Sequence, residues 1–273
     1  MGFDYNLLEE ANIIFEKEPM LIKLKTISNS IIVGDTHGDL DSSTYLINKY
    51  IDDDSINYVI FLGDYVDRGP KQIENINFLV EKKLQYPNKL VLLRGNHEWL
   101  EVNQNFGFYD EVITKMNKDT YEKYLEMFSK MSISFTSNNP INVIGVHAGI
   151  PVNPNEKYVY TLKDINQIEK NQKIFVPDNL ITQLVWNDPK ENVKYAKSSW
   201  RGAGYFFGIE AFDEFMEHNN LELCFRSHEA FHNVRTFFKD RLYSIFTCLP
   251  HYGITPNFLN INSEGKIIIN TIT

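Results

Sequence analysis

Residues 58–69, YVIFLGDYVDRG, join a short apolar run to a glycine and a group of charged side chains. A short apolar run bounded by a turn residue is consistent with a buried strand. Gly63 follows the run where the backbone has to turn sharply, and glycine does so without a Cβ penalty. The segment therefore predicts a strand whose end presents Asp64, Asp67 and Arg68 together.

Four other apolar runs are followed by polar residues in the same manner. These runs end in GDTHG (34–38), RGNHE (94–98), HAG (147–149) and RSHE (226–229). Ligands of an open α/β sheet bind outside the carboxyl ends of its strands, so we expect all five groups on one rim. A lone Asp or His at a strand end is often no more than a helix cap, but five such groups make that explanation improbable.

The chain between these groups alternates short apolar runs with longer amphipathic stretches, as βαβ units do. The predicted strands are residues 31–33, 58–62, 89–93, 142–146 and 221–225, and the predicted helices are 40–51, 72–83, 119–130 and 209–219. The C-terminal part is predicted to form two antiparallel hairpins, 234–238 with 242–247 and 258–261 with 266–272. We expect an α/β or α+β fold in which a mixed sheet folds back on itself.

Composition and charge narrow the function classes. Of the 273 residues, 43% are hydrophobic and 23% charged, which is ordinary globular usage, and no linker divides the chain. We therefore predict a single domain over residues 1–273. The 27 Lys and Arg against 36 Asp and Glu give a net charge of −9, the wrong sign for a protein that binds mainly nucleic-acid phosphates.

The sequence also bears on the compartment. No apolar run approaches the roughly 18 residues of a membrane span, and the N-terminus has no signal-peptide pattern. Cys224 and Cys248 lie far apart and form no CxxC, which fits a reducing compartment. We expect a cytoplasmic protein with neither nucleic acid nor membrane as a partner, and the sequence identifies no regulatory subunit.

The polar residues that follow the strands have the chemistry of a metal centre. They offer carboxylates, imidazoles and an amide oxygen, with no thiolate. This donor set suits Mn²⁺, Fe or Zn²⁺ and argues against a structural zinc site built on cysteines. A carboxylate such as Asp64 can bridge two ions because its two oxygens carry about four lone-pair sites. Two divalent or transition metal ions are therefore expected.

In this order and spacing, GDTHG, GDYVDRG, GNHE, HAG and RSHE resemble the signature of the PPP family of metal-dependent serine/threonine protein phosphatases, within the calcineurin-like metallophosphoesterase superfamily. LVWNDP (184–189), RGAGYFFG (201–208) and LPHYG (249–253) resemble further segments of that family. The resemblance implies an α/β fold in which mixed β-sheets form a central β-sandwich flanked by helices. It also implies a phosphoprotein phosphatase that acts on phosphorylated proteins.

The resemblance further implies roles for individual residues. The implied metal ligands, with Asp64 shared by both ions, are Asp35, His37, Asp64, Asn96, His147 and His228. His97 would be the general acid, and Asp67 the carboxylate that orients the imidazole and favours its charged form. The implied phosphate-binding residues are Arg68 and Arg201, with Tyr252 at the edge of the site. The implied reaction is direct attack on phosphorus by a hydroxide that bridges the metals.

Some positions depart from the family pattern, and other functions remain open. Ala148 replaces a glycine of the usual HGG, His251 stands where the family has Asn, and Gly253 stands where eukaryotic members often have Cys. The alternatives are a diadenosine tetraphosphate hydrolase, a broad-specificity metallophosphoesterase and a binding module without catalysis. His37, Asp67 and Glu98 favour protein substrates over the diadenosine nucleotide, and an intact set of ligands favours an enzyme.

Overall fold

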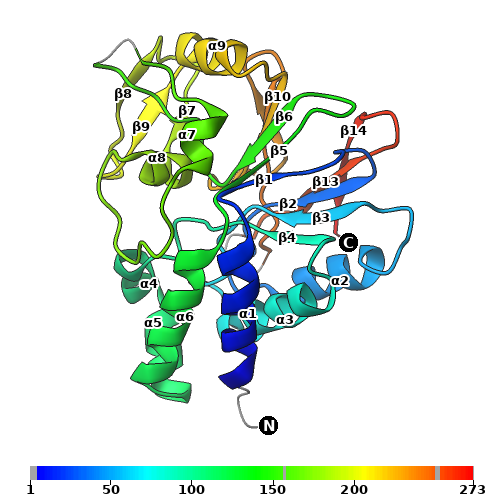
Figure 1. Ribbon diagram of the computed structural model, residues 1–273, viewed down its shortest axis with the longest axis vertical. Coiled ribbons are helices and arrows are strands. Elements are labelled where there is room, and N and C mark those ends of the chain that lie inside the picture. Colours follow the sequence, from blue (N-terminus) through cyan, green and yellow to red (C-terminus); the bar gives the residue numbers. More distant parts are fainter. Residues whose placement is uncertain (1–4, 156–157, 250–252, 273) are drawn as a thin grey trace.

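Two mixed β-sheets pack face to face at the centre of the molecule (Figure 1). The computed structural model describes residues 5–155, 158–249 and 253–272. The five-stranded sheet has the order β14-β13-β2-β3-β4 and consists of β2 (Ser30–Val33), β3 (Tyr58–Phe61), β4 (Leu90–Leu92), β13 (Asn257–Ile261) and β14 (Ile267–Thr271). The six-stranded sheet has the order β1-β5-β6-β10-β12-β11 and consists of β1 (Leu21–Lys23), β5 (Ser134–Ser137), β6 (Val143–Val146), β10 (Leu223–Arg226), β11 (Arg235–Phe237) and β12 (Leu242–Ser244).

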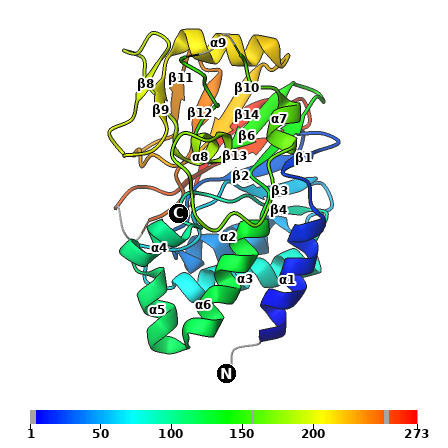
Figure 2. The ribbon, with the colours of Figure 1, turned by 60° about the vertical axis from the view of Figure 1, so that its left-hand side comes forward.

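Helices cover both outer faces of this sandwich (Figure 2). The outer face of the five-stranded sheet packs against α1 (Tyr5–Lys17), α2 (Leu40–Tyr50), α3 (Gln72–Gln85), α5 (Phe108–Lys115) and α6 (Lys118–Lys130). The outer face of the six-stranded sheet packs against α7 (Leu162–Asn166), α8 (Leu180–Trp186), α9 (Ile209–His218) and a three-stranded sheet of β7 (Asp188–Pro189), β8 (Ala196–Ser198) and β9 (Tyr205–Phe207). The implied β-sandwich flanked by helices is confirmed.

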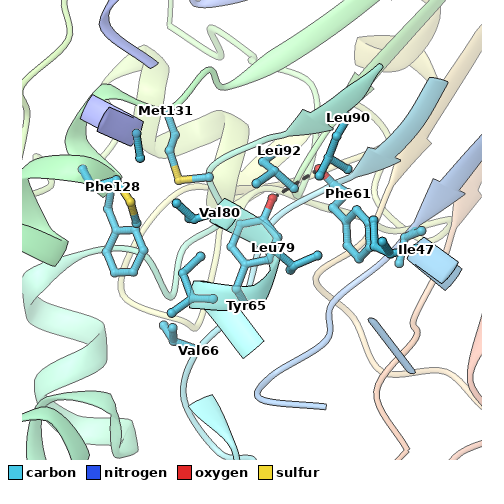
Figure 3. Close-up of a cluster of buried hydrophobic side chains, with 14 of the residues drawn as sticks. Ile47, Phe61, Tyr65, Val66, Leu79, Val80, Leu90, Leu92, Phe128 and Met131 are labelled. Atoms are coloured by element: carbon cyan, nitrogen blue, oxygen red, sulfur yellow. Dashed lines mark hydrogen bonds between the residues drawn. The ribbon is translucent and has the colours of Figure 1, made fainter. Parts of the chain in front are cut away.

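Strands β2, β3 and β4 of the five-stranded sheet are buried on both faces, which explains their continuous apolar runs. In β3, Phe61 faces the helices whereas Ile60 faces the other sheet. Figure 3 shows the helical side, where the sheet side chains pack with Leu79 and Val80 of α3. Tyr65 lies in the same cluster, and its hydroxyl donates to the carbonyl of Leu93 at 2.7 Å. A polar tip is thus satisfied inside the core.

The strand directions place the polar groups at one edge of the sandwich. β2, β3 and β4 are parallel, and β6 is parallel to β10. Isolated parallel bridges, Asp35 with Phe246 and Leu93 with Ser132, join segments just beyond the strands. The expectation of five groups on the rim of one sheet was therefore wrong in one respect: three groups come from one sheet and two from the other.

The elements predicted around the five groups are confirmed, and so are both C-terminal hairpins. The prediction omitted α1, the short strands β1 and β5, and the small elements between residues 100–115 and 158–207. In α1 the helical pattern was readable, since Leu8, Ala11 and Phe15 are buried at helical spacing. Within the described ranges, no helix has the length and apolar character that crossing a membrane requires.

Candidate active site

The five strand ends meet below a cavity of about 480 Å³. Its lining comes from the loops after β2, β3, β4 and β10, from α4 (Leu100–Phe106) and from residues 175–201. The lining residues are His37, Asp64, Arg68, Asn96, His97, Glu101, Val102, Phe106, Phe175, Trp186, Trp200, Arg201 and His228. Most of the residues that the sequence nominated therefore share one cavity.

Asp35 lies at the bottom of this region and is fully buried. Its Oδ1 accepts hydrogen bonds from the hydroxyl of Ser227 and from the backbone N–H of His228, the latter at 3.0 Å. Its Oδ2 has no hydrogen-bond partner among the described residues and lies 3.7 Å from His37 Nε2. The loop from β2 thus points an unsatisfied carboxylate oxygen at an imidazole nitrogen.

Asp64 lies at the centre of the group. Its Oδ2 is 3.7 Å from His37 Nε2, 3.3 Å from His147 Nε2 and 4.0 Å from His97 Nε2. Its Oδ1 accepts the backbone N–H of His97 at 2.9 Å. One carboxylate therefore faces three imidazoles that come from three different strand ends.

The loops hold several of these residues in a strained backbone conformation. Left-handed φ angles occur at His37 (42°), Asp64 (58°), Asp67 (67°), Arg68 (67°) and His228 (70°). Such angles are costly for residues with a Cβ and persist at sites where the surrounding structure enforces them. Four of these five residues line the cavity, and Asp67 precedes one of them, a concentration that is typical of a functional site.

Hydrogen bonds fix which nitrogen of two histidines faces the cavity. His37 Nδ1 lies 2.9 Å from the carbonyl of Val66, and His147 Nδ1 lies 3.0 Å from the carbonyl of Leu62. Because a carbonyl only accepts, Nδ1 of each ring carries the proton and Nε2 carries a lone pair. Metal-ligating histidines have this arrangement.

Asn96 provides the test of whether a cation fits. Its Oδ1 lies 2.9 Å from His147 Nε2 and 3.0 Å from His228 Nδ1. When His147 donates from Nδ1 to Leu62, its Nε2 and the amide oxygen are both acceptors, and a shared cation satisfies both. The groups whose ligand atoms are close enough for one ion are His37, Asp64 and His97, and Asp64, His147 and His228. The residues therefore fit the expected divalent metal ions.

Burial dominates the electrostatics of the cavity. Burial raises the pKa of Asp64 to about 8, while burial and the charge of Asp64 raise the pKa of Asp35 to about 6. Burial also lowers the pKa of His37 and of His228 well below its usual value. A cation bound among these groups would favour the ionised form of the carboxylates, and neutral imidazoles would not repel it.

His97 and Asp67 form a buried pair beside these groups. His97 Nδ1 lies 2.6 Å from Asp67 Oδ2, and Asp67 Oδ1 accepts the backbone N–H of Phe108 at 2.9 Å. The expected contact between imidazole and carboxylate is present. In the protein alone, burial, followed by the charge of Arg68, lowers the pKa of His97 well below its usual value.

Two cations project into the cavity against aromatic rings. The guanidinium of Arg68 lies 4.6 Å from the ring centroid of Phe106, and that of Arg201 lies 5.0 Å from the ring centroid of Trp200. Arg201 Nε also donates to Asp188 at 2.7 Å. These contacts orient both guanidinium groups, since a planar ring or a carboxylate fixes the plane of the fork.

Sequence reasoning assigned no structural role to two residues that support the site, Glu98 and Asp188. Glu98 accepts the backbone N–H groups of Asp64, Tyr65 and Gly95, each at 2.8 Å, and so ties two loops together. Asp188 accepts from Arg201 and, at 2.9 Å, from Arg226. Both acids stand in the quoted motifs GNHE and LVWNDP, but the motifs alone do not show which backbone they hold.

One nominated position, Tyr252, and two departures from the family pattern, Ala148 and His251, remain. His251 and Tyr252 lie outside the described residues. The methyl group of Ala148 is fully buried, and its backbone N–H donates to the carbonyl of Leu184 at 2.9 Å. The extra methyl is thus accommodated next to His147.

Residues 29–231 match the family described as calcineurin-like phosphoesterase. The chain belongs to this family. It is 36% identical over 199 residues to the serine/threonine-protein phosphatase 4 catalytic subunit of Saccharomyces cerevisiae, covering 72% of this chain and 61% of that protein. It is 33% identical over 232 residues to a probable serine/threonine-protein phosphatase of Encephalitozoon cuniculi, covering 82% of this chain and 48% of that protein.

Solved structures of phosphatases share the fold of this chain. A serine/threonine phosphatase from Saccharomyces cerevisiae, described as similar to human phosphatase PP5, superposes with a TM-score of 0.83 at 26% identity, covering 98% of this chain and 88% of that one. A cold-active protein-tyrosine phosphatase of a Shewanella species shares the fold, with a TM-score of 0.64 at 15% identity over 96% of this chain and 84% of that one. The resemblance to PPP phosphatases is confirmed, although the chain spans about half to three fifths of the curated relatives' lengths.

Proposed function

We propose that this chain is a metal-dependent serine/threonine protein phosphatase that hydrolyses phosphomonoesters on proteins. The observation that carries the proposal is a single cavity in which Asp64 faces three imidazoles, the His97–Asp67 pair and two arginines. The names of the yeast and microsporidian relatives support protein substrates. The proposal treats residues 1–273 as one catalytic domain.

The proposed metal ligands form two sets that share Asp64. Asp35, His37 and Asp64 would hold one ion. The second ion would be held by Asp64, Asn96, His147 and His228. When bound, two divalent cations lower the pKa of a water molecule towards neutrality and offset charge on the phosphoryl oxygens. We propose Mn²⁺ for this donor set, with Fe and Zn²⁺ as alternatives.

His97 is the proposed general acid. Its Nδ1 is held by Asp67, so Nε2 is the nitrogen that faces the cavity. Burial lowers the pKa of the imidazole, and the negative charge of a bound phosphate would stabilise its protonated form. A serine or threonine alkoxide is a poor leaving group and needs this proton.

Arg68 and Arg201 are the proposed phosphate-binding residues. Both guanidinium groups line the cavity and are oriented by a ring or a carboxylate before substrate arrives. Planar paired donors match two oxygens of a phosphoryl group and favour the charge that develops there in the transition state. Tyr252 at the edge of the site stays part of the proposal.

The proposal extends to partners and compartment. Phosphorylated proteins are the proposed substrates, and the net charge of −9 argues against nucleic acid as the main partner. A cytoplasmic location and the absence of a membrane partner also remain proposals.

The decisive experiment is a substrate comparison on one preparation. Chelated protein is reloaded with Mn²⁺, Fe²⁺ or Zn²⁺ and assayed on matched phosphoserine, phosphothreonine and phosphotyrosine peptides and on diadenosine tetraphosphate. We expect no turnover after chelation, restoration by Mn²⁺, and preference for the first two peptides. Faster hydrolysis of the dinucleotide would replace this function with the diadenosine tetraphosphate hydrolase, and full turnover without metal would overturn the metal centre.

A further inference from the structure

One acidic side chain in the wall of the cavity has a buried oxygen that no hydrogen bond from the described part of the chain satisfies. Glu101 belongs to the first turn of α4 and lines the cavity beside Phe106. Its Oε2 is buried, and no hydrogen-bond partner for it occurs among the described residues. Burying a carboxylate oxygen in this way is costly, so a donor that arrives with a ligand is favoured.

Glu101 has no part in the proposed metal or phosphate chemistry. The close groups of possible metal ligands in the described ranges are built around Asp64 and do not include it. A carboxylate also repels a phosphate, so Glu101 cannot help to hold the phosphoryl group. The position therefore calls for a cationic group elsewhere on the substrate.

The same cavity offers the surface that a cationic side chain prefers. Its wall includes Phe106, which is 43% exposed, and Trp200, which is 77% exposed, together with Phe175 and Trp186. Rings of this wall already accept guanidinium groups, because Arg68 lies over Phe106 and Arg201 over Trp200. A carboxylate among exposed aromatic faces matches both the charge and the apolar stem of lysine or arginine.

Charge in the cavity is thus divided between two functions. Arg68 and Arg201 provide positive charge for the phosphate, whereas Glu101 provides negative charge on the α4 wall. A peptide that carries a phosphate and a nearby basic residue complements both. A peptide with an acidic neighbour would instead place like charges together, which disfavours binding.

We propose that Glu101 makes this enzyme selective for phosphopeptides with a lysine or arginine close to the phosphorylated residue. The inference rests on the proposed function and adds the substrate class to it. Glu101 acts as a specificity-determining residue that binds the basic side chain, while the chemistry stays with the residues around Asp64.

The test uses phosphoserine peptides that differ at one position. A single arginine is moved from three residues before the phosphoserine to three residues after it, and each peptide is paired with one that carries citrulline there. Citrulline keeps the shape of arginine and removes its charge. At the best position we expect the arginine peptide to exceed its citrulline partner about tenfold in kcat/KM, and less at high salt.

Variants locate the effect. Glu101→Gln should bring the ratio of arginine to citrulline peptides close to one, and Glu101→Arg should invert the preference towards a glutamate peptide. The matched control is Glu10→Gln, which removes an exposed carboxylate from α1 and should keep the wild-type ratio. A second readout is the dissociation constant of a non-hydrolysable phosphonate peptide pair, measured by tryptophan fluorescence.

The outcomes separate the two proposals. The wild-type enzyme could hydrolyse p-nitrophenyl phosphate and every peptide, yet show a ratio of arginine to citrulline peptides near one. That result would overturn the selectivity and leave the phosphatase function standing. Retention of the ratio in Glu101→Gln would also overturn the role of Glu101. Failure of the metal-loaded enzyme to hydrolyse any of these phosphate esters would overturn the proposed function, and this inference with it.

Discussion

The floor and the rim of the cavity are built in different ways. The floor consists of Asp35, His37, Asp64, Asn96, His97, His147 and His228, and the rim consists of Glu101, Phe106, Phe175, Trp186 and Trp200. The histidine side chains of the floor are between 0 and 5% exposed. On the rim, Trp200 reaches 77%. The floor is part of the protein interior, whereas the rim is half-buried and exposes Phe106 and Trp200 to solvent.

The difference extends to how each part is held. Floor residues follow strands directly and are fixed by buried acceptors, as when Glu98 binds three backbone N–H groups of two loops. Rim residues come from the seven-residue helix α4 and from residues 175–200, outside the two large sheets. Preorganised groups that are buried away from water stabilise the charge of a transition state, so the floor suits catalysis. Aromatic side chains that solvent reaches can contact a bound peptide, so the rim suits substrate recognition.

The largest effect is expected from breaking the floor at its centre. Asp64→Asn keeps the size of the side chain and an acceptor for the His97 N–H but removes the shared charge. We expect loss of bound metal and a fall in kcat of about a thousandfold or more, which added Mn²⁺ does not restore. Metal analysis and rate assays on the same sample check this, with Asp110→Asn on α5 as the control. Near-normal metal content and rate would remove Asp64 from the centre.

The floor was also the part that the sequence predicted best. An apolar run, a turn and a chemical side chain are neighbours in the chain, so Asp64 and His97 could be nominated from local pattern. The side chains that hold the floor were harder to find. Asp188 binds Arg226 across 38 positions, and such long-range partners leave no periodic signal.

The fold shows the same limit. Runs such as 31–33 and 58–62 predict strands, but an apolar pattern does not state which sheet a strand joins. The division of the five groups between two sheets therefore had to come from the structure. Rim residues such as Trp200 were missed for another reason, because an exposed aromatic side chain follows no burial pattern.

The next effect separates proton donation from metal binding within the floor. His97→Ala should reduce kcat on phosphoserine peptides by about a hundredfold or more and on p-nitrophenyl phosphate by about tenfold at most. The reason is that an aryl phosphate leaves as a stabilised phenolate and needs no proton. Asp67→Asn should show the same split more weakly, because it disturbs the 2.6 Å contact with the imidazole.

Both substrates are measured on one preparation together with metal stoichiometry. Equal losses on the two substrates, with metals retained, would mean that His97 positions groups and does not donate a proton.

A smaller effect is expected where the floor meets the rim. Arg201→Ala or Arg68→Ala should lower kcat/KM by about a hundredfold, because each arginine offers donors to oxygens that gain charge in the transition state. Asp188→Asn should cost less, since Arg201 stays in place but loses its 2.7 Å partner. Metal content should not change in any of the three. If an arginine variant lost its metals, that arginine would be needed to hold the metal ligands of the floor in place, and its assignment to phosphate binding would fall.

The smallest effect is expected from the exposed rim. Trp200→Ala removes a ring that is 77% exposed and lies over Arg201, so its contribution to a bound peptide is limited by the solvent that already reaches it. We expect a rise in KM for phosphopeptides of about three- to tenfold, with a smaller change in kcat, since a rim residue touches the peptide equally in the bound and transition states. The matched control is Ile268→Ala, which removes an exposed apolar side chain from β14 on the sandwich. A fall in kcat that equals the fall in kcat/KM would place Trp200 with the floor, because only an interaction that strengthens in the transition state acts in that way.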